Sequence, residues 1–494
     1  MPTKNKHDWF RPKGYTHILP KISESFAASF VTNSQSVESY AFLPLIHVIL
    51  KTRKFKKVDD HCLNKKRAHS YLTDKGKYKR NAKPRKIFYA NHLDAQIYSY
   101  YANEILGKEY EKVMVSESQL SDCVTAYRKI PTKEDPEKNK CNIHFAKDVF
   151  DYINEQGNCV AIAFDISKFF DSLNHEILYK AWCELLQVSR LPKDHYNVYK
   201  SLTNFSYVNL KDILQVCGIK HPNDVYRKGL STFFNSRKEF IKNIKHNNLI
   251  KQHPFYNEST GEKEGIPQGT PISAFLANLY LLDFDKALQN RAYKVKGLYR
   301  RYSDDIVFIC AECDYEEIRQ FVIEYINDRF KLVIQTTKTQ VSIFRKENEK
   351  IKVFQVMDDK SIKENIPFQY LGLEFNGELA LLKSSSVGKY YRQAKRFINK
   401  KVRLAHKEQK FKFIRPDRHK RVFKRQLYKM FTHLGRHGTK RNYVLYANDA
   451  AKIFNHPKNP INKQINSAWN RLNKYLQKKI VAKGLLPFNK RLGK

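Results

Sequence analysis

The segment Ser303-Asp304-Asp305 constrains the fold of this chain more than any other, because a short apolar run flanks it on each side. Residues 297–302 and 306–310 each suit one strand, which predicts a hairpin with two carboxylates at its tip. A further apolar run, residues 158–164, predicts a buried strand that ends at Asp165. Carboxylates that lie close together repel one another, and a divalent cation relieves that repulsion. The pattern predicts a metal centre built from remote parts of the chain.

The charge of the chain indicates a polyanionic partner. Its 494 residues include 91 Lys and Arg against 49 Asp and Glu, a formal net charge of +42. Such an excess repels itself unless a polyanion offsets it, so nucleic acid is the leading expected partner and a membrane surface the second. Residues 401–494 alone hold 26 Lys or Arg against 3 Asp or Glu, with aromatic residues between them. We expect this part to be a basic helical domain that follows a phosphate backbone.

Targeting and cysteine signals favour a soluble protein. The first eleven residues lack an apolar signal core, and the longest apolar run, residues 41–50, is too short to cross a bilayer. The eight cysteines are scattered, and the pair Cys310 and Cys313 has no second ligand pair at zinc spacing. We therefore expect a cytoplasmic protein with reduced thiols and no membrane partner.

Periodicity and capping residues predict the remaining elements. Apolar spacing predicts helices over residues 89–110 and 145–153, and Asn174 offers a cap to a helix over residues 175–186. The order Thr270-Pro271 predicts a helix start, with the helix reaching about residue 288. Further short strands are expected at residues 332–334, 341–344, 352–356 and 370–375, and strand signals stop after about residue 378.

Five segments, taken in order, resemble motifs A to E of the reverse transcriptase palm. They are residues 164–173, 265–271, 301–305, 332–339 and 370–373. The resemblance implies an α+β right-hand polymerase, with fingers and an antiparallel palm sheet over residues 81–378. It also implies a mainly α-helical, basic thumb or C-terminal domain at residues 379–494 and a basic N-terminal extension at residues 1–80.

The resemblance also implies which groups hold the catalytic metal. Asp165, Asp304 and Asp305 match the carboxylates that bind two Mg²⁺ ions, with Mn²⁺ as an alternative, and the carbonyl of Ile166 is a further expected ligand. Lys338 matches a motif D lysine that donates a proton to pyrophosphate. As an exposed lysine it could equally be a solvated charge.

Other matching positions are expected to bind the incoming nucleotide and the primer. Phe170 falls at the position of a steric gate that rejects ribonucleotides, although packing in the core is the simpler role. Gln268 and Gly269 lie in the motif B turn, where glycine permits close backbone approach. Leu371 and Gly372 match the primer-grip turn. Basic residues expected to hold the triphosphate are Lys83, Arg85 and Arg128.

The chain departs from the family pattern at two places. Ser303 stands where alanine, methionine or valine is usual, and it is small enough for the hairpin. The stretch between motifs A and B, residues 182–263, is long, which suggests an insertion that binds a specific RNA or another subunit.

Within the family the chain looks most like the bacterial "unknown group" reverse transcriptases. That likeness implies antiphage defence through cDNA synthesis from dNTPs on a dedicated, structured non-coding RNA template, with a DNA product. Some relatives form homo-oligomers. Three alternatives stay open: RNA synthesis by the same palm chemistry, template-independent DNA synthesis, and an RNA-binding role like that of a maturase.

Overall fold

A computed structural model describes residues 6–53, 70–72, 78–80, 82–117, 120–357, 359–408, 422–433 and 442–485. Internal contacts divide the chain into two compact units. The first unit comprises residues 1–127, 166–290 and 320–335. The second unit comprises residues 128–165, 291–319 and 336–494. Among the described helices, none combines the length and the apolar character that crossing a bilayer requires.

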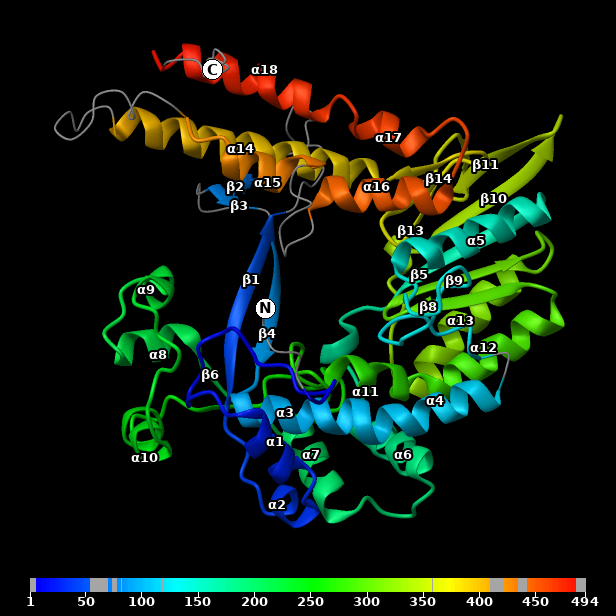
Figure 1. Ribbon diagram of the computed structural model, residues 1–494. Coiled ribbons are helices and arrows are strands. Elements are labelled where there is room, and N and C mark those ends of the chain that lie inside the picture. Colours follow the sequence, from blue (N-terminus) through cyan, green and yellow to red (C-terminus); the bar gives the residue numbers. More distant parts are fainter. Residues whose placement is uncertain are drawn as a thin grey trace. The chain divides into compact units, whose positions relative to one another are not determined.

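An antiparallel sheet forms the centre of the second unit (Figure 1). In the described residues its strand order is β12-β11-β10-β5-β9-β8, and every neighbouring pair is antiparallel. Strand β5 lies inside the sheet, which explains why its sequence is a nearly continuous apolar run rather than an alternating one. The strands are β5 Cys159–Asp165, β8 Leu298–Tyr302, β9 Asp305–Cys310, β10 Gln340–Glu347, β11 Lys350–Val356 and β12 Ile362–Glu364.

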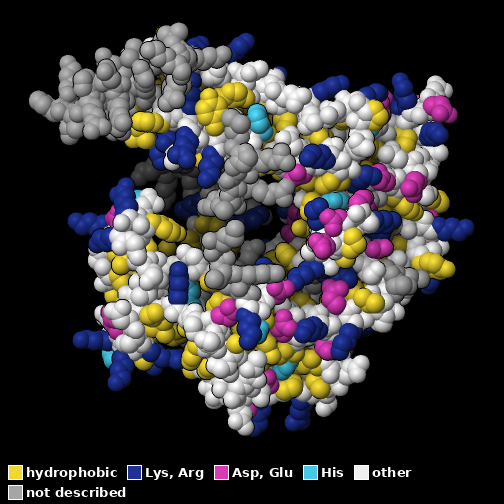
Figure 2. All heavy atoms as spheres, viewed as in Figure 1, with side chains coloured by type: hydrophobic (Ala, Val, Ile, Leu, Met, Phe, Trp, Pro, Cys, Tyr) yellow, Lys and Arg dark blue, Asp and Glu magenta, His cyan; other side chains and the backbone are white. Residues whose placement is uncertain are grey.

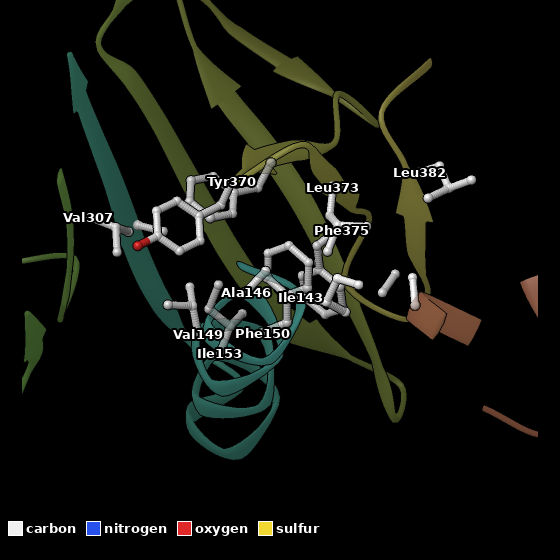
Figure 3. Packing of buried hydrophobic residues seen from close by; sticks show 14 of the residues in the cluster. Ile143, Ala146, Val149, Phe150, Ile153, Val307, Tyr370, Leu373, Phe375 and Leu382 are labelled. Atoms are coloured by element: carbon white, nitrogen blue, oxygen red, sulfur yellow. The ribbon is translucent and has the colours of Figure 1, made fainter. Parts of the chain in front are cut away.

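A buried apolar cluster joins this sheet to helix α5, Asn142–Gln156, and to a small sheet of β13, β14 and β15. The helix places one apolar face in the cluster because its apolar residues recur at helical spacing. Figure 3 shows Ile143, Ala146, Val149, Phe150 and Ile153 of α5 facing this core. The rings of Phe150 and Phe375 stack with centroids 4.9 Å apart. The small strands are β13 Phe368–Tyr370, β14 Leu373–Phe375 and β15 Ala380–Leu382.

The described part of the C-terminal segment is helical after β15. Helix α14 carries one buried apolar stripe, which packs with α15 and α18 in a separate cluster (Figure 1). Helices α16 and α17 contribute to the cluster around α5. These helices are α14 Ser384–Glu408, α15 Arg425–Phe431, α16 Tyr443–Phe454, α17 Pro460–Ile465 and α18 Ala468–Val481.

The first unit contains a second sheet, ordered β4-β1-β6-β7 in the described residues. Strands β1 and β4 pair antiparallel from Ile46 and Tyr89 to Arg53 and Ala82. Strand β6 runs parallel to β1. The strands are β1 Leu45–Arg53, β4 Ala82–Tyr89, β6 Ser206–Asn209 and β7 Lys251–Gln252, while β2 Ser70–Leu72 and β3 Tyr78–Arg80 form a separate hairpin.

Helices make up most of the rest of the first unit. A π-helical turn, Tyr101–Ile105, joins α3 to α4. The helices are α1 Glu24–Val31, α2 Ser34–Glu38, α3 His92–Tyr100, α4 Leu106–Ser116, α6 His175–Leu186, α7 Lys193–Thr203, α8 Leu210–Val216, α9 Pro222–Arg227, α10 Arg237–Phe240 and α11 Ser273–Tyr280. Helices α12 Leu282–Lys294 and α13 Tyr315–Phe330 each contain residues of both units.

Most sequence expectations about this fold are confirmed. The fold is α+β, with an antiparallel sheet at the centre of the second unit. Helix α6 has the predicted bounds, because the Asn174 side chain accepts a hydrogen bond from the Ile177 amide at 3.0 Å. The predicted domain boundaries at residues 80 and 378 stay predictions.

Four element predictions were wrong. The single helix expected from residue 271 to about residue 288 is two helices, α11 and α12, separated at Leu281. Residues 332–334 form no strand, because only Ile334 pairs, in an isolated bridge with Ile166. The strand expected over residues 370–375 is split by a turn at Leu371 and Gly372, which both have positive φ. Strand β15 lies beyond residue 378, where no strand was expected.

Candidate metal centre and nucleotide site

The hairpin of β8 and β9 presents two aspartates at its tip. Tyr302 pairs with Asp305, so only Ser303 and Asp304 connect the strands. Ser303 is buried and has a φ of 62°, the positive value that tight hairpin turns require. Beyond Asp305 every residue of β9 is buried, which anchors the hairpin. The predicted hairpin with an acidic tip is confirmed.

Strand β5 brings the third aspartate to the same place. Asp165 is its last residue and lies directly opposite Asp305 in the antiparallel pair. Residues that face each other across two strands project from the same side of the sheet. The two carboxylates are therefore neighbours although 140 positions separate them in sequence, and Asp304 adjoins them in the turn.

The electrostatics of the tip show that these carboxylates repel one another. Part of the Asp305 side chain is exposed, but burial of its carboxylate among protein atoms raises its pKa to about 6. The negative charges of Asp304 and Asp165 add to that rise. The positive charges of Lys383 and Lys338 oppose it. The site favours a cation near these oxygens.

Lys338 supplies one cation directly. It ends the 3₁₀ turn Thr336–Lys338, and its Nζ donates a hydrogen bond to Oδ1 of Asp165 at 2.8 Å. Both side chains are partly exposed, at 37% for Lys338 and 30% for Asp165, so the ion pair is open to competition from solvent ions. The structure therefore places Lys338 beside Asp165, a contact that the sequence did not reveal.

The donor set fits a hard divalent cation. Within the described ranges, no three carboxylate, thiol or imidazole side chains already form a closed set of metal ligands. Carboxylate oxygens are nevertheless the ligands that Mg²⁺ takes, and the Lys338 ammonium already stands where a cation would neutralise Asp165. Asp165, Asp304 and Asp305 are the residues that would hold the ions.

A cavity of about 340 Å³ opens beside Asp305 in the second unit. Its lining includes Lys383 and the turn at Leu371 and Gly372, whose φ values are 44° and 86°. Asn142 at the start of α5 fixes that turn, because its Nδ2 donates to the Leu371 carbonyl at 3.0 Å. The sequence predicted neither a site role for Lys383 nor the contact of Asn142 with this turn, because both depend on residues that are remote along the chain.

The predicted nucleotide-binding segments are held together in the first unit. The amide of Ile266 donates to the Phe170 carbonyl at 2.8 Å, and the amide of Phe88 donates to the Gln268 carbonyl at 2.9 Å. Gly269 has a φ of +123°, and a Cβ there would lie 2.6 Å from the Phe88 carbonyl oxygen. These contacts join the segment of Phe170, the motif B turn and strand β4.

The remaining predicted residues are placed as follows. Arg85 is exposed on β4, and the side chain of Lys83 on the same strand lies outside the described side chains. Ile166 is buried and belongs to the first unit, whereas Arg128 belongs to the second. The nucleotide and metal roles given to these residues, to Phe170 and to Gln268 stay predictions.

Comparisons with known proteins agree with the motifs. Residues 227–375 match the family model described as reverse transcriptase (RNA-dependent DNA polymerase). The chain is 28% identical over 167 residues to the retron Ec83 reverse transcriptase of Escherichia coli, a match that covers 30% of this chain and 52% of the relative. It therefore spans about half the length of that curated relative.

Solved telomerase structures are similar at a much lower level. Telomerase from Candida albicans in complex with a TWJ fragment of telomeric RNA gives a TM-score of 0.37 at 12% identity, covering 93% of this chain and 67% of that one. Apo telomerase from Candida tropicalis, truncated from its C-terminal domain, gives 0.36 at 11%, covering 61% and 52%. At this level the likeness carries no argument about function.

Proposed function

We propose that this chain, which carries a reverse transcriptase domain, is an RNA-directed DNA polymerase that uses dNTPs. The observation that carries the proposal is the pairing of Asp165 with Asp305 on adjacent strands, with Asp304 next to them in the hairpin turn. Three acidic side chains in a chain with a net charge of +42 need a chemical reason to lie together. Metal-dependent phosphoryl transfer is such a reason.

We assign metal binding to the aspartates and proton donation to Lys338. Asp165, Asp304 and Asp305 would hold two Mg²⁺ ions, with the Ile166 carbonyl as a further ligand, and bound ions of this kind would supply activation of the primer 3′-hydroxyl and stabilisation of the leaving pyrophosphate. The Nζ of Lys338 already donates a hydrogen bond to Asp165. Once its Nζ leaves Asp165, it is placed to donate a proton to pyrophosphate.

We assign discrimination of the nucleotide sugar to the first unit. We assign the Phe170 ring to the exclusion of the 2′-hydroxyl, and Gln268 and Gly269 to the nucleotide and template. The hydrogen bonds that join the Phe170 and Gln268 segments to neighbouring backbone support this assignment, because a gate must be held rigidly to discriminate one hydroxyl. Lys83, Arg85 and Arg128 are assigned to the triphosphate.

The biological role we propose is cDNA synthesis on a dedicated non-coding RNA in bacterial antiphage defence. Support comes from the strongly basic C-terminal segment, which suits a permanent nucleic-acid partner. The match to a retron enzyme of Escherichia coli is consistent with a bacterial setting.

Primer extension on an RNA template with separate dNTP and rNTP pools tests the polymerase proposal. We expect extension with dNTPs and little with rNTPs. Preference for rNTPs would identify an RNA polymerase instead. Equal dNTP incorporation with and without the template would identify template-independent synthesis, and no incorporation with retained RNA affinity would favour a maturase-like binding role.

A further inference from the structure

A groove of about 730 Å³ lies on the first unit, where β1 meets α8 and the loop that leads to α9. Most of its lining comes from residues 209–222, inside the long stretch between motifs A and B. None of the lining residues belongs to the catalytic or nucleotide-binding set described above. The groove is therefore a separate feature whose role the polymerase chemistry does not explain.

The walls of the groove are largely aliphatic. Ile49 on β1 keeps 49% of its surface exposed, and Leu214 on α8 lies buried behind the opposite wall. A groove with an apolar lining and an exposed aliphatic side chain in its wall is typical of a surface that receives a ligand.

The rim of the groove is positively charged. Lys211 and Lys220 both line it and are exposed, and neither has an ion pair within the part of the chain that the structure describes. The acidic lining residue, Asp212, already accepts a hydrogen bond from Nδ2 of Asn209 at 2.8 Å. Residues 210–252 as a whole hold 9 Lys or Arg against 3 Asp or Glu, and Figure 2 shows Lys and Arg side chains over the region of α8 to α10. Charge complementarity points to a polyanion.

One residue that lines the groove has a buried polar atom without a hydrogen-bond partner among the described residues. Nδ1 of His47 lies 2.9 Å from Oδ1 of Asn209. Because that oxygen can only accept, Nδ1 carries the proton and Nε2 of the neutral ring is an acceptor. Among the described residues Nε2 is buried and has no hydrogen-bond partner, while the ring itself is fixed by stacking on Phe88 at 4.8 Å. A base N–H or a 2′-hydroxyl would satisfy this acceptor once the atoms that cover it move aside.

We propose that this groove binds a single-stranded segment of RNA. Base faces lie against the aliphatic walls, Lys211 and Lys220 contact phosphates, and Nε2 of His47 accepts a hydrogen bond from a base or a 2′-hydroxyl. The positive charge of the rim favours RNA over an apolar peptide, because an apolar peptide has no negative groups to pair with the two lysines. Like the proposed function, this proposal expects an RNA partner. Binding of RNA in the groove does not, however, require polymerase activity.

The test measures how the full-length protein binds a fluorescein-labelled 12-nucleotide oligouridylate in excess unlabelled primer–template hybrid, which occupies the polymerase site. The double variant Lys211→Gln/Lys220→Gln should bind more weakly. Its plot of log affinity against log salt should be shallower by about 1.4, since each single-strand phosphate contact contributes roughly 0.7. The matched control, Lys108→Gln/Lys112→Gln on α4 of the same unit, removes the same charge from exposed lysines away from the groove and should leave the slope unchanged.

A second measurement locates the RNA directly. Oligonucleotides that carry 4-thiouridine should crosslink to peptides containing residues 47–50 or 209–222. Equal slopes for both double variants, or crosslinks confined to other peptides, would overturn the proposal. The proposal would also be overturned if a groove variant kept its RNA affinity but no longer co-purified with a protein partner. Both double variants should extend a short preannealed primer to the same degree. Failure of the polymerase proposal would be recognised separately, because the wild-type protein itself would not extend this primer.

Discussion

Substitution of Gly265 by alanine should disturb the joint between motifs A and B. Gly265 has a φ of +76°, and an added Cβ would lie 2.4 Å from the Asp171 carbonyl oxygen and 2.6 Å from its carbon. The positive φ costs alanine about 1–2 kcal/mol, and forcing a methyl against rigid backbone costs roughly 1–3 kcal/mol more. Weakening the hydrogen bond from the Gly265 amide to the Leu173 carbonyl, 2.7 Å in the native chain, adds about 1 kcal/mol. We expect Gly265→Ala to lower the free energy of unfolding by about 3–6 kcal/mol.

Gly261 provides the matched control. Its φ is +69°, but nothing lies within 4 Å of an added Cβ, so Gly261→Ala should cost only the conformational term of about 1–2 kcal/mol. Urea titration followed by tryptophan fluorescence measures both variants, because fully buried Trp182 belongs to the same unit. Gly265→Ala should also raise the KM for dNTPs by displacing Phe170. Equal destabilisation by the two substitutions would refute the close contact with Asp171.

Three further predictions concern the gate, the metal centre and pH. Phe170→Ala should permit incorporation of rNTPs while dNTP use persists, measured as the ratio of kcat/KM for the two sugars; unchanged rejection of rNTPs would remove the gate assignment. Lys338→Met should tighten binding of Mn²⁺, followed by electron paramagnetic resonance of the free ion, because the ammonium no longer competes for Asp165; weaker binding would contradict this. Burial lowers the pKa of His17 to about 3, below the ordinary 6.5, and its Nδ1 accepts from the Ile18 amide at 2.7 Å. Between pH 3 and pH 6.5 the unfolded chain therefore holds a proton on His17 that the folded chain does not, so the free energy of unfolding should rise with pH. At pH 5 it should be about 2 kcal/mol lower than at neutral pH. A His17→Gln variant with the same pH slope would show that another group is responsible.

Local signals in the sequence were enough to predict the centre of the site. The hairpin around Ser303 and the cap at Asn174 each depend on a few adjacent residues, and both are present. The apolar run before Asp165 marks a strand inside a sheet, which periodicity can recognise. Conversely, the strand expected at residues 332–334 was wrong because pairing depends on a partner strand, and only Ile334 has one.

Features that depend on tertiary packing could not be predicted. The contact between Lys338 and Asp165 joins residues 173 positions apart, and no local pattern reveals it. Lys383 affects the pKa of Asp305, yet in sequence it is one of many lysines in a basic segment. The groove beside His47 likewise arises where β1 meets residues 209–222, which are remote in sequence.

Single-turnover primer extension by the Asp304→Asn variant tests the central claim most directly. The substitution preserves side-chain size and removes one charge from the partly exposed hairpin turn, so folding and RNA affinity should match the wild type. We predict a fall in the rate of dNTP addition on an RNA template by a factor of roughly 10² or more, the size of effect seen when a group that stabilises the transition state is lost. Extension at the wild-type rate, with RNA affinity unchanged, would contradict a catalytic centre at this hairpin.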